Sequence, residues 1–510
     1  MLRKIRIILA AVFFIGITLL FLDFTGTLHH WLGWMAKVQF LPAVLAINVI
    51  VIAALVILTL IFGRIYCSVI CPLGIMQDLI ARLRRKKNKY SYSKPLSWLR
   101  YTMLAVMVLA IVFGVASVVQ LLAPYSSFGR IATAILQPLW MLGNNLLAGA
   151  AERFDSYTFY SVDVWLKSIP LLVIAIVTLL IVGGLAIKNG RTYCNTICPV
   201  GTLLGFIARF SFLKVRFVSD KCKNCSLCSK NCKASCIDYK THTVGYSRCV
   251  ACGNCISKCK FGALVYAHSV PSGNTVSQPQ DDEVKVEETT QSPNTSKKQE
   301  KVNKGRRSFF MVTALATSAV IAQEKKKVHG GLAVIEEKEV PSRNTPITPP
   351  GSLSADNMAK RCTGCQLCVS ECPNGVLRPS TSLLSIMQPV MSYERGYCRP
   401  ECTRCSDVCP TGAIKPITTA DKSATQIGHA VFISKNCIAV TKGVECGNCE
   451  RHCPVGAIEM VPLNEEDEDT PFIPAVNENR CIGCGACENL CPARPLSAIY
   501  VEGHEVHKSV

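Results

Sequence analysis

Most of the long apolar runs lie in the first 190 residues of this 510-residue chain. Four of them are long enough, or nearly so, to cross the roughly 30 Å hydrocarbon layer of a membrane as helices. They are Ile5–Leu22, Ala43–Phe62, Met103–Leu122 and Ile169–Ile187. Because almost no charge interrupts these runs, they indicate membrane spans rather than buried core helices. We therefore predict a four-helix transmembrane unit over residues 1–205.

Lysine and arginine indicate the orientation of these helices. The loop Arg64–Arg100 carries nine of them, whereas loops 23–42 and 123–168 carry one and three. Basic loops remain on the cytoplasmic side of a membrane. We therefore expect both ends of the unit in the cytoplasm, in a bacterial inner membrane, with the two sparse loops outside.

Beyond residue 215 the chain is polar and rich in cysteine. Between Cys362 and Cys491 one pattern occurs four times: closely spaced cysteines, then a fourth cysteine followed by proline. The copies contain Cys362, Cys365, Cys368 and Cys372; Cys398, Cys402, Cys405 and Cys409; Cys437, Cys446, Cys449 and Cys453; and Cys481, Cys484, Cys487 and Cys491. In bacterial ferredoxins three such cysteines hold one [4Fe–4S] cluster and the fourth ligates the neighbouring cluster. Residues 350–505 are thus predicted to form an α+β, ferredoxin-like domain with four clusters.

Two other cysteine-rich classes fit this spacing less well. Zinc ribbons need two Cys-x2-Cys pairs for four ligands, without a third cysteine at fixed spacing or a following Cys-Pro. A disulfide framework would not repeat one ferredoxin spacing so often. Glycines such as Gly364, Gly447, Gly483 and Gly485 also allow the backbone to turn close to a cluster.

A smaller ferredoxin-like unit is predicted over residues 215–265. Its two motifs consist of Cys222, Cys225, Cys228 and Cys232, and of Cys249, Cys252, Cys255 and Cys259. Crossed ligation predicts one cluster on the first three cysteines with Cys259, and another on Cys249, Cys252 and Cys255 with Cys232. Lys233 and Lys260 replace the usual prolines. Cys236 is a surplus thiol that either substitutes for Cys232 or stays free.

A repeat follows the second and fourth apolar runs, at Arg64–Gly74 and Arg191–Gly201. Each copy holds two cysteines four residues apart, a spacing that places both sulfurs on one face of a helix. If the helix pairs are structural repeats, Cys67, Cys71, Cys194 and Cys198 converge on a metal or cluster position, or on a redox-active thiol group. The alternative is that they are reduced, structural cysteines at helix ends.

Two segments join the predicted ferredoxin regions. Residues 268–304 are polar, without apolar periodicity, and predict a disordered tether. The segment 305–323 places Arg306 and Arg307 before a short apolar run, a candidate fifth membrane element that resembles a twin-arginine export signal. We therefore expect residues 215–304 in the cytoplasm and 350–505 in the periplasm. The alternative is that both ferredoxin regions are cytoplasmic.

The net charge of +20 lies beside the apolar runs, which is a topology signal and does not indicate nucleic-acid binding. No serine, cysteine–histidine or carboxylate constellation suggests bond-making catalysis, so any enzymatic activity would be quinol oxidation. No histidine lies inside the four runs, so a haem crossing the bilayer has no ligands. The pair His29–His30, beside Trp31 and Trp34, could border a quinone pocket, although interfacial aromatics are ordinary anchors.

The motifs resemble two known families. Residues 1–265 resemble the NapH family of membrane ferredoxins, related to NosR and CcoG proteins, through Arg64–Gly74, Arg191–Gly201 and the two-cluster unit. Residues 305–505 resemble the NapG/MauM family of exported ferredoxin-type proteins, through the paired arginines, Pro349-Pro350-Gly351 and the four motifs. The chain looks like a fusion of the two. The resemblance implies electron transfer from quinol towards a periplasmic reductase, nitrate reductase in the type case.

Analogy with four-cluster ferredoxin subunits implies nested pairing of the last four motifs. The first would pair with the fourth and the second with the third, so that Cys491 joins Cys362, Cys365 and Cys368; Cys372 joins Cys481, Cys484 and Cys487; Cys453 joins Cys398, Cys402 and Cys405; and Cys409 joins Cys437, Cys446 and Cys449.

Our hypothesis is a membrane-bound carrier with six [4Fe–4S] clusters, which draws on the quinone pool and serves a periplasmic redox partner. The alternative is an accessory or maturation protein for a respiratory metalloenzyme, with CcoG-like metal handling at the boundary cysteines.

Overall fold

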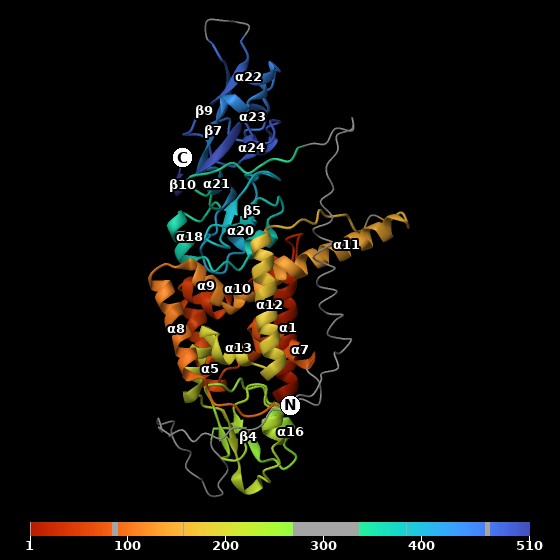
Figure 1. Ribbon diagram of the computed structural model, residues 1–510, viewed down its shortest axis with the longest axis vertical. Coiled ribbons are helices and arrows are strands. Elements are labelled where there is room, and N and C mark those ends of the chain that lie inside the picture. Colours follow the sequence, from red (N-terminus) through yellow and green to blue (C-terminus); the bar gives the residue numbers. More distant parts are fainter. Residues whose placement is uncertain are drawn as a thin grey trace, which may run out of the picture.

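The computed structural model describes residues 2–83, 90–156, 158–268, 336–383, 385–464 and 470–509. Almost all of the predicted tether and the whole segment with Arg306 and Arg307 lie outside these residues, so the export prediction stays a prediction. The described chain forms an elongated molecule of three parts (Figure 1). A helical body (2–210) lies in the middle, with the inner unit (214–267) at one end and the outer unit (336–509) at the other.

The helical body is built from the following elements. They are α1 (Leu2–Leu22), α2 (His29–Leu32), α3 (Trp34–Lys37), α4 (Phe40–Leu45), α5 (Val49–Phe62), α6 (Tyr66–Val69), α7 (Pro72–Ile80), η1 (Ala81–Leu83), α8 (Ser97–Val112), α9 (Ala116–Leu122), α10 (Pro124–Ile131), η2 (Ala132–Leu136), α11 (Gln137–Glu152), α12 (Ile169–Asn189), α13 (Thr192–Thr196), α14 (Pro199–Ile207) and η3 (Ala208–Phe210). Of these, η2 is a π-helix and η1 and η3 are 3₁₀-helices.

Helices α1 and α12 run the length of the body in opposite directions. At the start of α1, Arg3 donates a hydrogen bond to Ser257 of the inner unit, and further along α1 packs against the outer unit. Just before α12, Lys167 donates to the carbonyl of Val369 in the outer unit. Just after α12, Arg191 donates its backbone N–H to Lys233 of the inner unit. The two helices thus join the two ferredoxin-like units.

Only these two helices, over Arg3–Leu22 and Ile169–Asn189, are long and apolar enough among the described residues to cross a membrane. The prediction of four uninterrupted spans is wrong for the other two. Ala43–Phe62 is divided into α4 and α5 at Ile47, which has a φ of +56°, and Asn48 then caps α5 by accepting a hydrogen bond from Val51. Met103–Leu122 is divided into α8 and α9 at Gly114, whose left-handed φ of +70° ends the helix.

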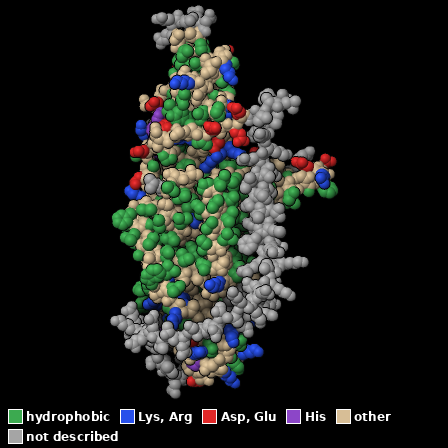
Figure 2. All heavy atoms as spheres, viewed as in Figure 1, with side chains coloured by type: hydrophobic (Ala, Val, Ile, Leu, Met, Phe, Trp, Pro, Cys, Tyr) green, Lys and Arg blue, Asp and Glu red, His purple; other side chains and the backbone are tan. Residues whose placement is uncertain are grey.

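The surface of the helical body is largely apolar on the face that Figure 2 draws, where hydrophobic side chains cover a broad area. Exposed positions occur on helices that are far apart in sequence. Ile8 on α1, Ile50 on α5, Val112 on α8 and Val173 on α12 are each at least half exposed. A continuous apolar surface of this extent is typical of a face that meets lipid or another protein.

The inner unit is a small α+β fold. It contains β1 (Lys214–Phe217), η4 (Ser219–Lys221), α15 (Leu227–Lys230), β2 (Ile237–Asp238), β3 (Thr243–Val244), α16 (Asn254–Lys258) and β4 (Leu264–Ala267). Strands β1 and β4 pair antiparallel, with Lys214 opposite Ala267, and β2 pairs antiparallel with β3. Seven of the nine cysteines in this unit pack in its own core, which is separate from that of the helical body.

The outer unit repeats this architecture twice. It contains α18 (Ala355–Arg361), α19 (Leu367–Glu371), β5 (Leu377–Pro379), β6 (Pro389–Met391), α20 (Arg404–Asp407), α21 (Thr419–Ser423), β7 (Thr425–Phe432), η5 (Ser434–Asn436), α22 (Ile438–Lys442), α23 (Asn448–Arg451), β8 (Ile458–Pro462), β9 (Phe472–Val476), α24 (Ala486–Leu490) and β10 (Ile499–Ser509). Antiparallel pairs form between β5 and β6, β8 and β9, and β7 and β10. The first two cysteine motifs share one continuous core with the helical body, whereas the last two have a core of their own.

His507 on strand β10 contacts residues 348–353, which lie before the first cysteine motif of the outer unit. Its backbone N–H donates to Leu353, and its ring lies 2.9 Å from the Thr348 hydroxyl. Burial lowers the pKa of His507 to about 4, from an ordinary value of 6.5. Because the unfolded chain binds the proton more readily, this contribution to stability is complete above pH 6.5 and is lost as the pH falls towards 4.

We expect acidification from pH 7 to 5 to loosen the contact between β10 and residues 348–353, by about 1 to 2 kcal/mol because the residue is only partly buried. Hydrogen–deuterium exchange of the β10 amides, corrected for intrinsic rates, measures this loss. The variant His507→Gln keeps a polar partner for Thr348 but cannot be charged, so its exchange should depend less on pH. Equal pH dependence in both proteins would contradict the prediction.

Candidate iron–sulfur sites

The inner unit brings its cysteines together in the two sets that crossed pairing predicts. Cys222, Cys225, Cys228 and Cys259 line one cavity, closed by aromatic and aliphatic side chains such as Phe217, Tyr239 and Leu264. Cys249, Cys252, Cys255 and Cys232 line a second cavity, of about 300 Å³, part of it open to solvent. Thiolates grouped in this way are the usual ligands of [4Fe–4S] clusters.

Cys236 belongs to the second of these cavities. Its sulfur lies 3.6 Å from that of Cys232, and it is fully buried at the start of β2. Its hydrogen bond lowers the pKa of the Cys232 thiol to about 7. Cys232 and Cys236 both line this cavity, so both stay candidates for the fourth position of this set.

Short left-handed turns shape four of the six motifs. The second residue after the first cysteine and the residue after the second cysteine both have positive φ. The pairs are Asn224 and Ser226, Ala251 and Gly253, Gly364 and Gln366, and Gly483 and Gly485. Successive turns of this kind point backbone N–H groups inward, which suits an anionic cluster. Glycine marks only half of these eight positions, so the sequence alone did not indicate the rest.

The outer unit pairs its motifs in sequence, not in the nested order that the analogy implied. The charges of Cys365 and Cys368 interact with Cys409, and that of Cys405 with Cys372. Likewise Cys491 lines a cavity with Cys437, Cys446 and Cys449, and Cys453 lies beside Cys481, Cys484 and Cys487. The nested pairing is therefore wrong: each motif shares its cysteine sets with the motif adjacent in sequence.

Backbone N–H groups donate hydrogen bonds to sulfur atoms of these cysteine sets, which favours the anionic thiolate. The fourth cysteine accepts a backbone N–H in three motifs: Cys409 from Ile414, Cys453 from Ala457 and Cys491 from Ala498, at 3.2–3.4 Å. Hydrogen bonds to sulfur are one of the factors that determine the reduction potential of a cluster. Burial raises the pKa of Cys365 and of Cys484 to about 12, so these thiols release protons when metal binds.

The boundary motifs do not form continuous helices, contrary to the spacing argument. Cys67 lies on α6, whereas Cys71 precedes α7 with extended backbone, and Cys198 precedes α14 in the same way. The cause is Pro72 or Pro199 at the first helical position, since a residue before proline avoids helical geometry. All four boundary cysteines are nevertheless buried, and their thiols lie within electrostatic range of one another.

The two copies of the boundary repeat hold each other through arginine. Arg64 donates to the carbonyl of Cys194 at 3.0 Å, and Arg191 donates to the carbonyl of Cys67 at 2.5 Å. Both guanidinium groups are fully buried. A Cβ at Gly74 would lie 2.3 Å from the carbonyl oxygen of Cys67, and Gly201 stands in the same relation to Cys194. Arginine therefore recurs in the repeat because it bonds to the cysteine carbonyl of the other copy, and glycine recurs because the cysteine carbonyl of its own copy approaches it closely.

Lys233, which replaces a ferredoxin proline, docks the inner unit on the body. Its amine lies 3.1 Å from Asp78, which also pairs with Arg191 at 2.9 Å and Arg6 at 3.5 Å. Because Lys233 follows Cys232 directly, this ion-pair network connects the second inner cysteine set to the boundary repeat. Sequence reasoning noted the missing proline but could not find its partner, which lies 155 positions earlier.

The outer unit docks on α9 and α10 through the first cysteine motif. A Cβ at Gly129 would lie 2.2 Å from the carbonyl oxygen of Cys365, so only glycine allows this approach. Gln120 donates to the carbonyl of Cys362 at 3.5 Å. His29 on α2 lies beside Asp407 of α20, so this helix also meets the outer unit.

Within the described residues, no three His, Cys, Asp or Glu side chains are close enough to hold a single metal ion. A [4Fe–4S] cluster separates its four cysteine sulfurs more widely than one ion does, so the sets above suit clusters better than zinc.

Comparison with protein families supports the cluster assignment. Residues 44–90 and 169–217 match a 4Fe–4S binding domain, and residues 245–376, 361–414 and 442–494 match 4Fe–4S dicluster domains. The ferredoxin-type protein MauM of Methylobacillus flagellatus is 34% identical over 170 residues, which cover 32% of this chain and 70% of MauM. Over that third of its length, the chain belongs to the MauM family of ferredoxin-type proteins.

Other relatives of this ferredoxin-type chain are more distant. The ferredoxin-type protein NapH of Escherichia coli is 27% identical over 227 residues, 43% of this chain and 67% of NapH. The electron transport protein YccM of E. coli is 25% identical over 235 residues, 46% of this chain. That match spans only 59% of the length of YccM. No solved structure matches the chain.

The sequential pairing can be tested by the signals that single substitutions remove. Cys365→Ser and Cys409→Ser should abolish the same cluster signal in electron paramagnetic resonance (EPR) spectra, and each should lower the iron content by about four atoms. Cys446→Ser and Cys491→Ser should share a different signal. If Cys365→Ser and Cys491→Ser instead removed the same signal, the nested arrangement would be restored.

Proposed function

We propose that the protein is a membrane-bound electron carrier that passes electrons from quinol towards a periplasmic redox partner. One observation carries the proposal: two cluster-binding units lie at opposite ends of a helical body, and α1 and α12 connect them. A carrier needs redox groups on both sides of the layer it serves. The identity of the chain as an iron–sulfur protein is supported by its four matches to 4Fe–4S domains.

The ligands would be the 24 cysteines of the six ferredoxin motifs, three from one motif and one from its neighbour. The six [4Fe–4S] clusters, when bound, would each accept and release one electron at a time. The surrounding residues bury the clusters, hold them in pairs and supply hydrogen bonds to sulfur. Together these determine the order in which the clusters are reduced.

We further propose that the helical body crosses the bacterial inner membrane several times. The apolar surface of α5 and α8, in addition to α1 and α12, supports this arrangement. The basic loop between α7 and α8 favours the inner unit in the cytoplasm. The outer unit would then be periplasmic, as in a fusion of a NapH-type protein with an exported NapG/MauM-type protein, and nitrate-reductase systems would be the model for its partner.

The four boundary cysteines favour a second candidate, an accessory protein for maturation of a respiratory metalloenzyme. Their thiols are grouped and buried, and Gln77 donates to the sulfur of Cys194 at 3.1 Å. Such a group could bind or reduce a metal. Copper bound at these cysteines, together with clusters that quinol fails to reduce, would favour this candidate over the carrier.

Iron analysis and reduction by quinol test the carrier function. The anaerobically purified full chain should contain about 24 iron atoms and as many acid-labile sulfides, the content of six clusters. Menaquinol should bleach the visible absorbance of the clusters, and a quinone-site inhibitor should prevent this. A colourless protein with zinc in place of iron would refute the assignment, and clusters that only dithionite reduces would refute quinol as donor.

Export can be tested with the paired arginines. A periplasmic reporter fused after Val510 should be active, and replacing Arg306 and Arg307 with lysine should abolish that activity because the twin-arginine pathway requires arginine. Replacing Lys325 and Lys326 with arginine is the matched control and should change nothing. A reporter that works only in the cytoplasm would establish the alternative in which both units are internal.

A further inference from the structure

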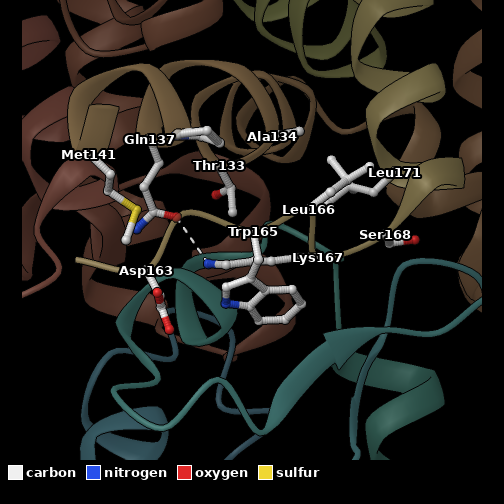
Figure 3. A pocket seen from close by; sticks show the side chains of 11 residues that line it. Thr133, Ala134, Gln137, Met141, Asp163, Trp165, Leu166, Lys167, Ser168 and Leu171 are labelled. Carbon is white, nitrogen blue, oxygen red and sulfur yellow. Dashed lines mark hydrogen bonds between the residues drawn. The ribbon is translucent and has the colours of Figure 1, made fainter. Parts of the chain in front are cut away.

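A cavity of about 390 Å³, part of it open to solvent, lies where the helical body meets the outer unit (Figure 3). It is bounded by the π-helix η2, by the start of α11 and by residues 163–171 before and at the start of α12. A π-helical turn often marks a functional site, because it opens the regular hydrogen-bond ladder.

The lining of this cavity is apolar except for a small polar group. Met141, Leu166 and Leu171 supply apolar walls. The polar side chains of the lining are Thr133, Gln137, Asp163, Lys167 and Ser168. Figure 3 shows the Lys167 amine joined to the side-chain oxygen of Gln137, a bond of 3.0 Å. A flat, apolar ring that carries oxygen atoms matches this combination.

Two hydrogen-bonding groups at the cavity are available to a ligand. The Thr133 side chain is 1% exposed, and its hydroxyl has no partner among the described residues. An ammonium group has three donors. The Lys167 amine uses two of them, on Gln137 and on the carbonyl of Val369. A buried hydroxyl without a partner is costly, so a ligand that hydrogen-bonds it would be favoured.

The cavity adjoins the cluster loops directly. Lys167 donates to Val369, and Gln137 donates to the carbonyl of Ser370 at 3.3 Å, so both hold helix α19. That helix runs between Cys368 and Cys372, which belong to the two cysteine sets of the first outer pair. A redox ligand in the cavity would thus lie next to both clusters of this pair.

The residues around the cavity would let an apolar ligand enter from a membrane and let protons leave to water. Helix α11 projects sideways from the body at the level of the outer unit (Figure 1), and Trp140 and Leu146 on it are at least half exposed. Asp163, at the cavity, is exposed to solvent. Trp165 holds the segment against the outer unit, with the guanidinium groups of Arg378 and Arg395 within 5 Å of its ring centre.

We propose that this cavity binds the head group of a quinol, an inference that rests on the proposed function. Oxidation of one quinol to quinone breaks two O–H bonds and releases two electrons and two protons. The electrons pass one at a time to the two clusters beside α19, and the protons leave through water at Asp163. Thr133 and Lys167 position both the quinol and the quinone by hydrogen bonds to the ring oxygens.

The experiment compares the variant Thr133→Val with the wild-type holoprotein. The substitution keeps the side-chain shape and removes the hydroxyl. The concentration of menadiol that gives half-maximal cluster reduction should rise about fivefold, and menadione should bind more weakly in equilibrium dialysis by a similar factor. Iron content and reduction by dithionite should not change. Ser126→Ala is the matched control, because the Ser126 hydroxyl is equally buried and unpartnered in the described structure but does not line the cavity.

A second variant, Ala134→Leu, fills the cavity and should abolish menadione binding while the clusters remain intact. If both variants bind menadione and are reduced by menadiol like the wild type, the cavity is not the quinol site, although the carrier function stands. If the wild type binds menadione in a Thr133-dependent manner but menadiol does not reduce its clusters, the binding site stands and the carrier function fails. Absence of menadione binding by the wild type overturns the cavity proposal itself.

Discussion

Each ferredoxin motif depends on a cysteine that its neighbour supplies, and this constraint organises both ends of the molecule. Three sulfurs come from one motif and the fourth from the other motif of the pair, which lies directly before or after it in sequence. The short helices of each pair therefore pack together, α15 with α16, α19 with α20 and α23 with α24. Because the cysteine sets form the centre of each unit, two-stranded sheets are sufficient to close it.

The helical body holds the two units through hydrogen bonds to backbone carbonyls in or near the cysteine motifs. Gln120, Gln137 and Lys167 donate to carbonyls at Cys362, Ser370 and Val369 on the outer side. On the inner side, Arg64 and Arg100 both donate to the carbonyl of Ser247, two residues before Cys249.

The sequence predicted which residues carry the chemistry more reliably than it predicted how they are arranged in space. Cysteine spacing identified every motif and grouped the inner sets as the structure has them, because those two motifs had only each other as partner. With four motifs, spacing could not decide between nested and sequential pairing, and analogy chose the wrong one. Hydropathy located the apolar runs but not their breaks, which depend on single residues such as Ile47 and Gly114.

Long-range partners were the least accessible to sequence reasoning. The repeated arginine was visible in both boundary motifs, but its role requires the carbonyl of the other copy, about 130 residues away. The cavity beside α19 combines η2, α11 and the segment before α12, none of which carries a recognisable motif. Such sites arise where elements meet, and no periodicity within one element predicts them.

The arrangement also bears on how electrons pass a helical body that lacks haem ligands. Helix α12 has 21 residues and is therefore about 31 Å long, which is too far for direct transfer between clusters at its two ends. In the proposed arrangement, a quinol oxidised beside α19 would deliver electrons to the outer clusters without any crossing, because the quinol itself would move within the membrane. The inner clusters then need a separate connection. The boundary cysteines lie next to the second inner set through Lys233, Asp78 and Arg191, so they occupy the position where such a connection would begin.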